Sequence, residues 1–396
     1  MPWKDRTVKN TREEFVNRVL ANEKSKSALC REYGISRPTG DKWISRYKNG
    51  DSMKDHSRTP FGSPNKTDKE IEQKILDLRK MHPAQGATKL RRMLENKGEQ
   101  NLPCNSTVNA ILKRNGCITK EATEAAMPYN RFEKELPNDM WQVDFKGKFQ
   151  LENKEMCYPL CILDDHSRFN LCTEAKQNEK RLPVIESFKR VFLEYGMPKT
   201  LLCDNGNPWG TAQSTGITLF EVWLMDLGIL TLHGRVYHPQ TQGKEERFNG
   251  SLKRELLKYY SFKDFNEAQL RFDEYRTFYN NERPHHALKL DVPAQHYVKS
   301  NISMPEKVEE WKYTSEYETR IIKTTGFFTY KGQGYYLSES LGSLEVGVKP
   351  SSTDGFVNLF YRNFRIARIN IIEQSVVSRR IYLTENDPRF EPRVRN

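Results

Sequence analysis

The sequence predicts a multidomain protein in which an all-α amino-terminal region precedes an α/β core with a mixed sheet and a small all-β region. Three observations support this expectation. Helical patterns separated by glycine-containing turns fill the first 120 residues, strands and amphipathic helices alternate over 135–300, and short strands with Gly or Asp-Gly turns occupy 319–372. A chain of 396 residues is long enough for several domains.

The first helical unit, residues 1–50, has the pattern of a helix-turn-helix. Helix candidates at 12–21 and 27–33 are followed by a glycine-containing turn and a third candidate at 37–47. Ser36 is expected to cap that last helix, with Pro38 in its first turn. Because the start of such a helix enters the major groove, we assign DNA contacts to three residues there: Arg37, Thr39 and Lys42.

A second helix-turn-helix is predicted over residues 67–120, with helices at 68–81, 86–96 and 106–115. Residues 51–66 between the two units are rich in Pro, Gly and Ser and are interpreted as a linker. Arg58 in this linker either enters a DNA minor groove or belongs to a plain tether, and the sequence leaves both options open.

Positive charge is concentrated in this amino-terminal region. Residues 1–120 contain 26 Lys and Arg against 14 Asp and Glu, whereas residues 121–396 contain 38 of each, so the net charge of +12 resides in the first part. Because neutralising phosphates releases condensed counterions, we expect binding to a polyanion to begin there.

The α/β core is predicted over residues 135–300. Strand patterns at 140–151, 157–163 and 169–173 precede an amphipathic helix at 179–195, which ends at Gly196. A short buried strand at 200–203 then places Asp204 at its carboxyl end, where open α/β sheets bind ligands. Strands followed by alternating helix and strand predict a mixed sheet covered by helices.

Three acidic residues in this core are candidates for a metal-dependent phosphoryl-transfer site: Asp144, Asp204 and Glu246. Mg²⁺ and Mn²⁺ prefer hard oxygen ligands, so a few carboxylates suffice without His or Cys. Two such ions can activate a nucleophile and stabilise a leaving oxygen at a phosphodiester. However, a chain with 52 acidic residues contains many such triples by chance. The surrounding motifs decide.

Those motifs occur in five segments, at 140–144 (MWQVD), 162–168 (ILDDHSR), 201–206 (LLCDNG), 238–249 (HPQTQGKEERFN) and 279–288 (YNNERPHHAL). In this order they resemble the integrase core of DDE insertion-sequence transposases and, more distantly, retroviral integrases. The resemblance implies an RNase H-like fold, with Asp144, Asp204 and Glu246 as catalytic metal ligands for Mg²⁺, for which Mn²⁺ can substitute. Glu246 is chosen because it keeps register with Gly243, and Glu245 is the next candidate.

Other residues near the expected site keep two interpretations. Lys253 shares a helix face with Glu246 and is either a DNA phosphate contact or a solvated lysine. Residues 208–216 make the gap between the last two carboxylates longer than in most relatives of this kind, and their composition indicates a surface loop. Trp209 in that loop either anchors it or stacks on a base. Asp164 and Asp165 are expected to form a turn rather than bind metal.

The carboxy-terminal region 319–372 contains five short strand candidates, at 319–330, 333–337, 344–349, 356–360 and 365–370. Five strands favour a small barrel. The integrase resemblance implies that this is an SH3-like barrel, and residues 373–396 are expected to be a mobile tail.

Composition excludes several classes of protein. Nothing approaches 18 consecutive apolar residues and the start has no apolar signal region, so we expect a protein without a membrane partner, cytoplasmic and nucleoid-associated if prokaryotic. Seven cysteines without a CxxC spacing favour reduced thiols over a disulfide framework. No Gly-rich phosphate loop is present, so ATP is not implied.

The sequence therefore predicts a DDE transposase that binds the terminal inverted repeats of its mobile element, cleaves the ends and joins the 3′ hydroxyl to target DNA. Its expected partner is double-stranded DNA, on which it is at least a dimer, with the barrel and residues 279–288 as candidate bridging surfaces. Two alternatives remain: an RNase H-like nuclease or recombinase without strand transfer, and a catalytically inactive DNA-binding regulator.

Overall fold

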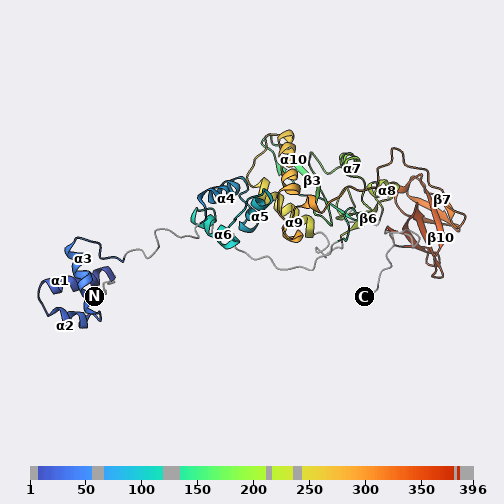
Figure 1. Cartoon of the computed structure of the whole chain (residues 1–396). Coiled ribbons are helices and arrows are strands. Elements are labelled where there is room, and N and C mark those ends of the chain that lie inside the picture. The colour runs from blue at the N-terminus through green and yellow to red at the C-terminus, as the bar shows by residue number, and fades with distance from the viewer. Residues whose placement is uncertain are drawn as a thin grey trace. The chain divides into compact units, whose positions relative to one another are not determined.

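The computed structural model describes residues 8–55, 67–118, 134–210, 216–234, 243–378 and 381–383. The chain divides into two compact units, Met1–Thr67 and Asp68–Asn396, and each is described by itself (Figure 1). Within the described ranges, every helix is too short or too polar to cross a bilayer.

The first unit is a three-helix bundle of α1 (Val8–Leu20), α2 (Lys26–Glu32) and α3 (Arg37–Lys48). Ser36 caps α3 by accepting a hydrogen bond from the Thr39 amide, and proline occupies the first turn, as the sequence predicted. The helices approach closely at Gly40, where a Cβ would lie 2.8 Å from the Cys30 sulfur and 3.1 Å from the Phe15 ring. A larger residue at that position would separate the helices.

The second helical bundle consists of α4 (Lys69–Met81), α5 (Ala87–Asn96) and α6 (Asn105–Arg114) and has its own apolar core, which includes Ile75, Leu90 and Ile111. It also contacts α10 (Phe265–Asn281) and the chain beyond it. The His82 ring stacks on Phe278 at 4.2 Å, and Arg92 donates to Asp291 at 3.1 Å. This bundle is therefore attached to the α/β core.

The central sheet contains β1 (Trp141–Phe145), β2 (Phe149–Gln150), β3 (Met156–Asp164), β4 (Asn170–Lys176), β5 (Thr200–Cys203) and β6 (Leu230–His233). Its order is β2-β3-β1-β5-β6, with β4 also pairing with β3. The β1-β3, β2-β3 and β3-β4 pairs are antiparallel, whereas the β1-β5 and β5-β6 pairs are parallel. The predicted mixed sheet is therefore confirmed.

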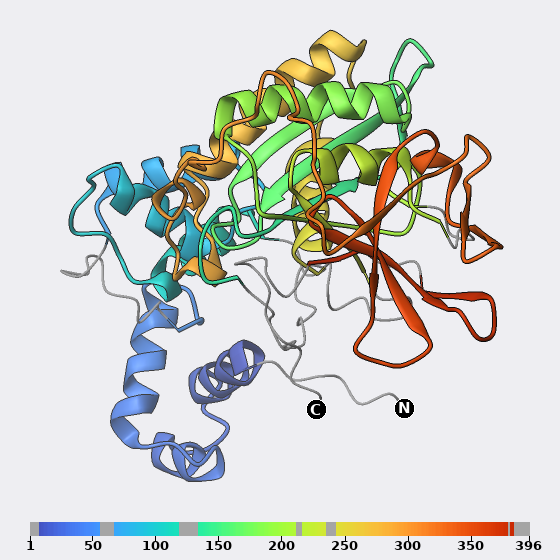
Figure 2. The same cartoon turned by 90° about the vertical axis from the view of Figure 1, so that its right-hand side faces the viewer.

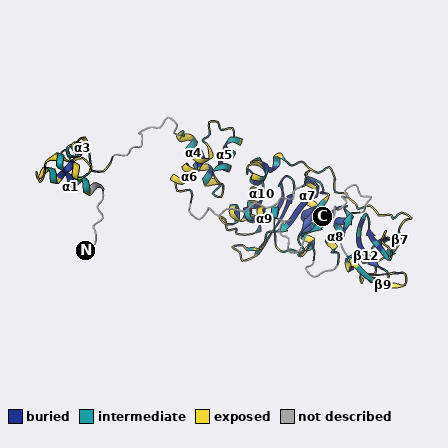
Figure 3. Cartoon of the chain, turned by 90° about the horizontal axis from the view of Figure 1, so that it is seen from below, coloured by how far each residue is buried: buried dark blue, intermediate teal, exposed yellow. Residues whose placement is uncertain are grey.

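Helices cover both faces of this sheet. Helix α7 (Arg181–Tyr195) lies along one face, as Figure 2 shows, and packs with α8 (Leu219–Asp226) against Trp141, Val143 and Ile162. Helix α9 (Gly243–Leu252) and α10 pack on the opposite face against Cys161 and Leu163. Strand residues alternate between the two faces, so neighbouring residues belong to different clusters. The strands form the most deeply buried layer of the core (Figure 3).

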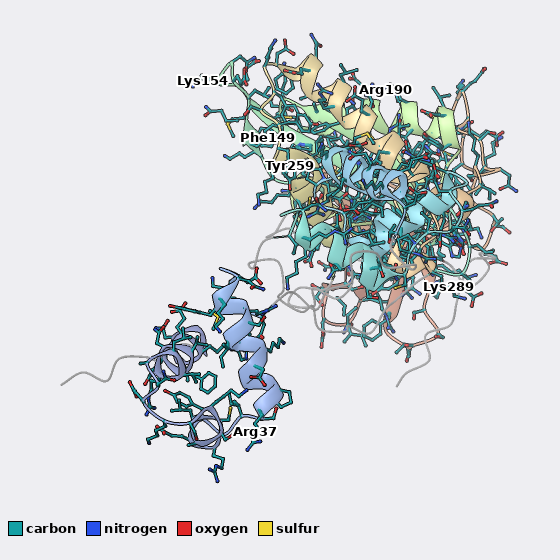
Figure 4. All side chains as sticks on the ribbon, turned by 60° about the vertical axis from the view of Figure 1, so that its left-hand side comes forward. Arg37, Phe149, Lys154, Arg190, Tyr259 and Lys289 are labelled. Carbon is teal, nitrogen blue, oxygen red and sulfur yellow. The ribbon has the colours of Figure 1, made fainter. Side chains whose placement is uncertain are left out.

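Some predicted elements differ from the structure. The expected strand at 140–151 is two strands, because Gly147 adopts a φ of +87° between β1 and β2. The helical spacing of apolar residues over 179–195 predicts that Leu182 faces the core, but it is 63% exposed on α7. The spacing of Phe248, Leu252, Leu256 and Tyr259 likewise predicts that Tyr259 faces the core. Tyr259 is 47% exposed, because a π-helical segment (Lys253–Leu257) follows α9 and changes the helical phase (Figure 4).

The carboxy-terminal region is all-β, as predicted, but a closed SH3-like barrel is not confirmed. The larger sheet contains β7 (Glu318–Ile321), β10 (Glu345–Pro350), β11 (Phe356–Tyr361), β12 (Phe364–Asn370), β13 (Ser375–Ser378) and β14 (Tyr382–Leu383). Its order is β13-β12-β11-β10-β7, with β14 pairing with β12. A separate hairpin is formed by β8 (Phe327–Tyr330) and β9 (Gln333–Tyr336). In the described residues, no pairing joins the two ends of the larger sheet.

Part of the expected mobile tail is structured. Strands β13 and β14 both pair with β12, so residues 375–378 and 382–383 extend the sheet instead of forming a tail. Ile381 belongs to the apolar cluster of this region, which explains the pairing, because burial of its side chain stabilises the ordered strand. Residues 384–396 lie outside the described part of the chain.

The carboxy-terminal sheet packs on the α/β core through α8 and β6. One apolar cluster contains strand residues together with Val222, Met225 and Leu230 of the core. Asp226 at the end of α8 accepts hydrogen bonds from the Tyr361 hydroxyl at 2.7 Å and the Arg362 Nε at 2.8 Å.

Candidate active site

Strand register brings Asp144 and Asp204 to the same edge of the sheet. Parallel β1 and β5 pair Trp141 with Leu201 and Gln142 with Leu202, so two residues further on Asp144 is level with Asp204. Strand residues alternate between faces, and the odd-numbered neighbours contact the α7 side. Both aspartates therefore lie on the face that α9 covers, about one strand spacing, roughly 4.8 Å, apart in the backbone.

Helix α9 is held against these strands by two polar contacts. Asn249 donates from Nδ2 to Asp144 Oδ2 at 2.9 Å. In the first turn, the Lys244 ammonium lies 2.6 Å from Asp165 Oδ2, and Gln142 donates to the other oxygen of that carboxylate. Asp165 is thus occupied in a structural role, in agreement with the turn predicted for it.

The two glutamates in the first turn of α9 have different surroundings. Glu246 is exposed, whereas Glu245 is only 2% exposed and lies close enough to Asp144 and Asp204 for their charges to affect it. The helix geometry gives the reason. Asn249 fixes the face of α9 that meets Asp144, and Glu245 is four residues earlier, on nearly the same side. Glu246 is thus assigned by motif register alone.

The electrostatics of the site are unfavourable without a cation. Burial, and then the charge of Asp204, raises the pKa of Asp144 to about 7. Burial, and then the charges of Asp144, Asp204 and Asp165, raises the pKa of Glu245 well above its usual range. Both oxygens of Glu245 lack a hydrogen-bond partner among the described residues. An uncompensated buried carboxylate is costly, so this cluster favours a bound positive charge.

The donor chemistry fits a hard divalent cation, although the arrangement is not complete. Carboxylate oxygens are the ligands that Mg²⁺ and Mn²⁺ prefer. In the described ranges, no group of three or more His, Cys, Asp or Glu side chains is already arranged to hold a metal ion. Asp144 and Asp204 lie on one face of the sheet with Glu245 buried beside them, whereas the exposed Glu246 would need to turn toward them.

Three other expectations near the site can be compared with the structure. Trp209 is 1% exposed and packs between the rings of Phe145 and Phe220, so it anchors its loop and is not available to a DNA base. Residues 211–215 of that loop lie outside the described part. Lys253 is exposed, which leaves both of its interpretations open.

The proposed DNA contacts of the first unit have different surroundings. Arg37 and Lys42 are exposed on α3, and Figure 4 shows Arg37 at the outside of its unit. Thr39 is partly buried and its hydroxyl lies 2.8 Å from that of Ser36, so it takes part in the helix cap. Arg58 lies outside the described residues.

The sequence did not single out one polar pair next to Asp204. His233 at the end of β6 lies between the backbone carbonyl of Asp204, at 2.8 Å, and Glu221 Oε1, at 2.9 Å. The capping pattern that begins α8 with Thr218 and Glu221 was the available signal, because it marks a glutamate whose position is fixed.

Comparison with known protein families agrees with this geometry. Residues 134–239 and residues 227–293 each match a family model described as an integrase core domain. Residues 11–61 match a helix-turn-helix domain model, and residues 39–112 match a homeodomain-like domain model. The two amino-terminal helical units therefore agree with known DNA-binding architectures.

Individual relatives are more distant. A putative transposase for insertion sequence element IS5376 from Geobacillus stearothermophilus is 24% identical over 246 residues, or 59% of this chain and 60% of that protein. An insertion element IS476 uncharacterized 39.2 kDa protein from Xanthomonas euvesicatoria is 26% identical over 160 residues, or 40% of this chain and 44% of that protein. The chain thus spans less than two thirds of each relative's length.

Among solved structures, the HTLV-2 integrase catalytic core domain in complex with magnesium (trimeric form) shares 20% sequence identity. The match covers 41% of this chain and 99% of the integrase chain, with a TM-score of 0.32. The family models and the insertion-sequence relatives confirm the resemblance seen in the motifs: residues 134–293 of this chain are similar to integrase core domains and to proteins of insertion elements.

Proposed function

We propose that this chain is a transposase that binds the terminal inverted repeats of its mobile element, cleaves the ends and joins the freed 3′ hydroxyl to target DNA. The observation that carries this proposal is the convergence of Asp144, Asp204 and the first turn of α9 at one edge of a mixed sheet. That edge belongs to the segment that matches the integrase core models.

The residues of the chain prepare the site for phosphoryl transfer. Asp144 and Asp204 would hold divalent cations, with Asn249 orienting the first carboxylate and the Gly206 amide, 2.8 Å from Asp204 Oδ1, orienting the second. Two such cations would activate the attacking oxygen and stabilise the leaving oxygen. Lys253, exposed beyond the site on the same helical segment, contacts a DNA phosphate.

The third carboxylate comes from the first turn of α9. We keep Glu246, because it has the motif register, and its exposed side chain would turn toward the aspartates when a cation binds. Glu245 is the direct competitor, since it is buried beside the aspartates without a hydrogen-bond partner in the described part of the chain. The isosteric variants Glu246→Gln and Glu245→Gln separate the two, because each removes a charge with little change of shape.

DNA recognition belongs to the amino-terminal helical units. The net positive charge of the chain resides in residues 1–120. Arg37 and Lys42 are exposed on α3 and supply base or phosphate contacts, with Thr39 in a supporting position and Arg58 in the linker. Because phosphate contacts release counterions, affinity for the element ends falls as salt rises.

Assembly on DNA requires at least two protomers to hold two ends. The segment 279–288 is a weaker bridging candidate than the sequence indicated, because Arg283 and His285 are buried against their own core. The carboxy-terminal sheet remains a candidate, since exposed apolar side chains occur at its edge strands and beside them, including Ile321, Ile372 and Val377.

The test uses the full-length chain, DNA carrying the terminal repeats of the element, and Mg²⁺. Metal-dependent cleavage at the repeat ends, followed by joined products with target DNA, is the expected result. Cleavage without joined products would favour the nuclease alternative, and repeat binding without any metal-dependent product would favour the regulator. In the same assay, loss of products in Glu246→Gln with retention in Glu245→Gln supports Glu246, and the reverse assigns Glu245.

A further inference from the structure

His233 lies at a junction of three elements beside the candidate site. It ends β6 and pairs in register with Cys203, the residue before Asp204. Its Nδ1 lies 2.8 Å from the Asp204 carbonyl oxygen and its Nε2 lies 2.9 Å from Glu221 Oε1. A carbonyl and a carboxylate are both acceptors, so both ring nitrogens donate and the imidazole carries a proton on each.

Glu221 is itself fixed in place. It is 6% exposed, and its second oxygen accepts a hydrogen bond from the Thr218 amide at 2.7 Å, which closes the capping box of α8. His233 and Glu221 therefore join the start of α8 to the backbone of Asp204 by two hydrogen bonds in series.

The backbone after Asp204 needs such a partner. Asp204 follows the last residue of β5, so its carbonyl has left the strand ladder. The loop is held on its other side by Asn205, which donates to the Gly234 carbonyl at 3.0 Å. With the peptide plane fixed by His233 and the carboxylate bound by the Gly206 amide, the direction of the Asp204 side chain is determined.

We propose that His233, oriented by Glu221, is a positioning residue that holds the Asp204 carboxylate beside Asp144 for binding of a divalent cation. This inference rests on the proposed function, because it assigns a supporting role within the same site. Groups that orient metal ligands without touching the metal commonly change metal affinity by about 10- to 100-fold when they are removed.

Two variants of His233 separate its two hydrogen bonds. The amide nitrogen of Asn occupies the place of Nδ1, so His233→Asn keeps the bond to the Asp204 carbonyl and removes the partner of the buried Glu221 Oε1. The amide nitrogen of Gln occupies the place of Nε2, so His233→Gln keeps Glu221 paired and loses Asp204. We expect the two variants to rank in opposite orders for stability and for cation affinity: His233→Asn is the less stable variant, and His233→Gln is the weaker cation binder.

The experiment measures Mn²⁺ affinity of the full chain by isothermal titration calorimetry and the melting temperature of the metal-free protein. A loss of about 10- to 100-fold in Mn²⁺ affinity for His233→Gln, with His233→Asn near wild type, supports the inference. Affinities that follow the melting temperatures instead, or that do not change, would show a merely structural role. Asp204→Asn is the control: if it too binds Mn²⁺ like wild type, the proposed site itself fails, whereas weakened binding in this control alone overturns only the role of His233.

Discussion

Two buried glutamates ten residues apart on one helical segment have opposite surroundings. Glu245 in the first turn of α9 is 2% exposed, and both of its oxygens lack a hydrogen-bond partner in the described ranges. Glu255 in the π-helical segment is also buried, but Arg283 donates to its two oxygens at 2.6 and 2.7 Å. Burial raises the pKa of each, yet Arg283 brings that of Glu255 below its ordinary value.

This difference separates a carboxylate that is paired inside the protein from one that has no hydrogen-bond partner among the described residues. The side chains of Arg283 and Glu255 are 6% and 8% exposed, and they satisfy each other, with Ser251 accepting a further bond from the guanidinium. Around Glu245 the neighbouring charges are carboxylates, so the folded protein retains electrostatic repulsion at the sheet edge. Such retained strain is typical of functional sites, where a cation or substrate compensates it.

The largest effect is expected at Asp144 and Asp204, the two aspartates whose charges act on Glu245. Asp144→Asn and Asp204→Asn each remove a charged cation ligand with little change of shape, so cleavage and joining should fall by at least about 10²–10³-fold, the scale for losing one preorganised electrostatic group. Binding to the terminal repeats, measured by gel shift on the same preparations, should remain within about threefold. Glu186→Gln, an exposed change on α7, is the matched control. Retained activity in either aspartate variant would remove that residue from the site.

Substitution of Glu255, the carboxylate paired with Arg283, should lower stability instead of activity. Glu255→Gln leaves the Arg283 guanidinium buried without a counter-charge, and breaking a buried ion pair in this way costs about 3–5 kcal/mol. Glu245→Gln removes an uncompensated charge, so the metal-free protein should keep or gain stability. Urea unfolding of both variants measures the difference. Equal losses in the two would show that the surroundings of Glu245 and Glu255 are not opposite.

The sequence could identify Asp144 and Asp204 as candidate residues, but it could not predict which glutamate of α9 is buried beside them. Asp144 and Asp204 stand in local motifs at strand ends, and strand pairing then brings them together. Which of Glu245 and Glu246 faces them depends on the phase of α9, which a long-range bond from Asn249 to Asp144 fixes. Such a bond, 105 residues apart in the chain, leaves no periodic trace in the sequence.

Other differences have the same origin in tertiary contacts. The hydrogen bonds of His233 with Asp204 and Glu221 join three separate elements. Helical spacing placed Tyr259 inside, but the π-helical segment before it changed the phase. Periodicity therefore predicted most of the elements and the strands that carry Asp144 and Asp204, whereas contacts between elements determine which side chains are paired.

The raised pKa of Asp144 should also make the stability of the metal-free protein depend on pH. The pKa of Asp144 is raised to about 7 in the folded state by burial and by Asp204, above its ordinary value of 3.8. The folded state thus binds a proton more tightly than the unfolded state, so the contribution is fully present at low pH and is lost as the pH rises through about 7. Relative to Asp144→Asn, wild type should lose up to about 1.4 kcal/mol more per pH unit between pH 5 and 7.

Urea titrations in EDTA across pH 5 to 8 measure this slope for both proteins. Saturating Mg²⁺ should make the wild-type curve flatter, because a bound cation favours the ionised carboxylate and stabilises the folded state. Parallel curves for wild type and Asp144→Asn in EDTA would contradict the raised pKa of Asp144.

The smallest effect is expected at Lys253, a positively charged side chain of the same helical segment. Arg283 is buried and paired with Glu255, whereas Lys253 is exposed and free to meet a phosphate. Lys253→Ala should weaken DNA binding by up to about 1 kcal/mol for any sequence and lower the salt slope of binding by about one unit, because one phosphate contact is lost. Lys189→Ala, which changes an exposed lysine of α7, serves as the control and should change neither quantity.

Since the loss for Lys253→Ala is expected to be equal for repeat and scrambled DNA, fluorescence anisotropy at several salt concentrations distinguishes a phosphate contact from a base contact. A loss confined to repeat DNA would instead make Lys253 part of sequence recognition, and equal slopes for both lysine variants would show that it is only solvated.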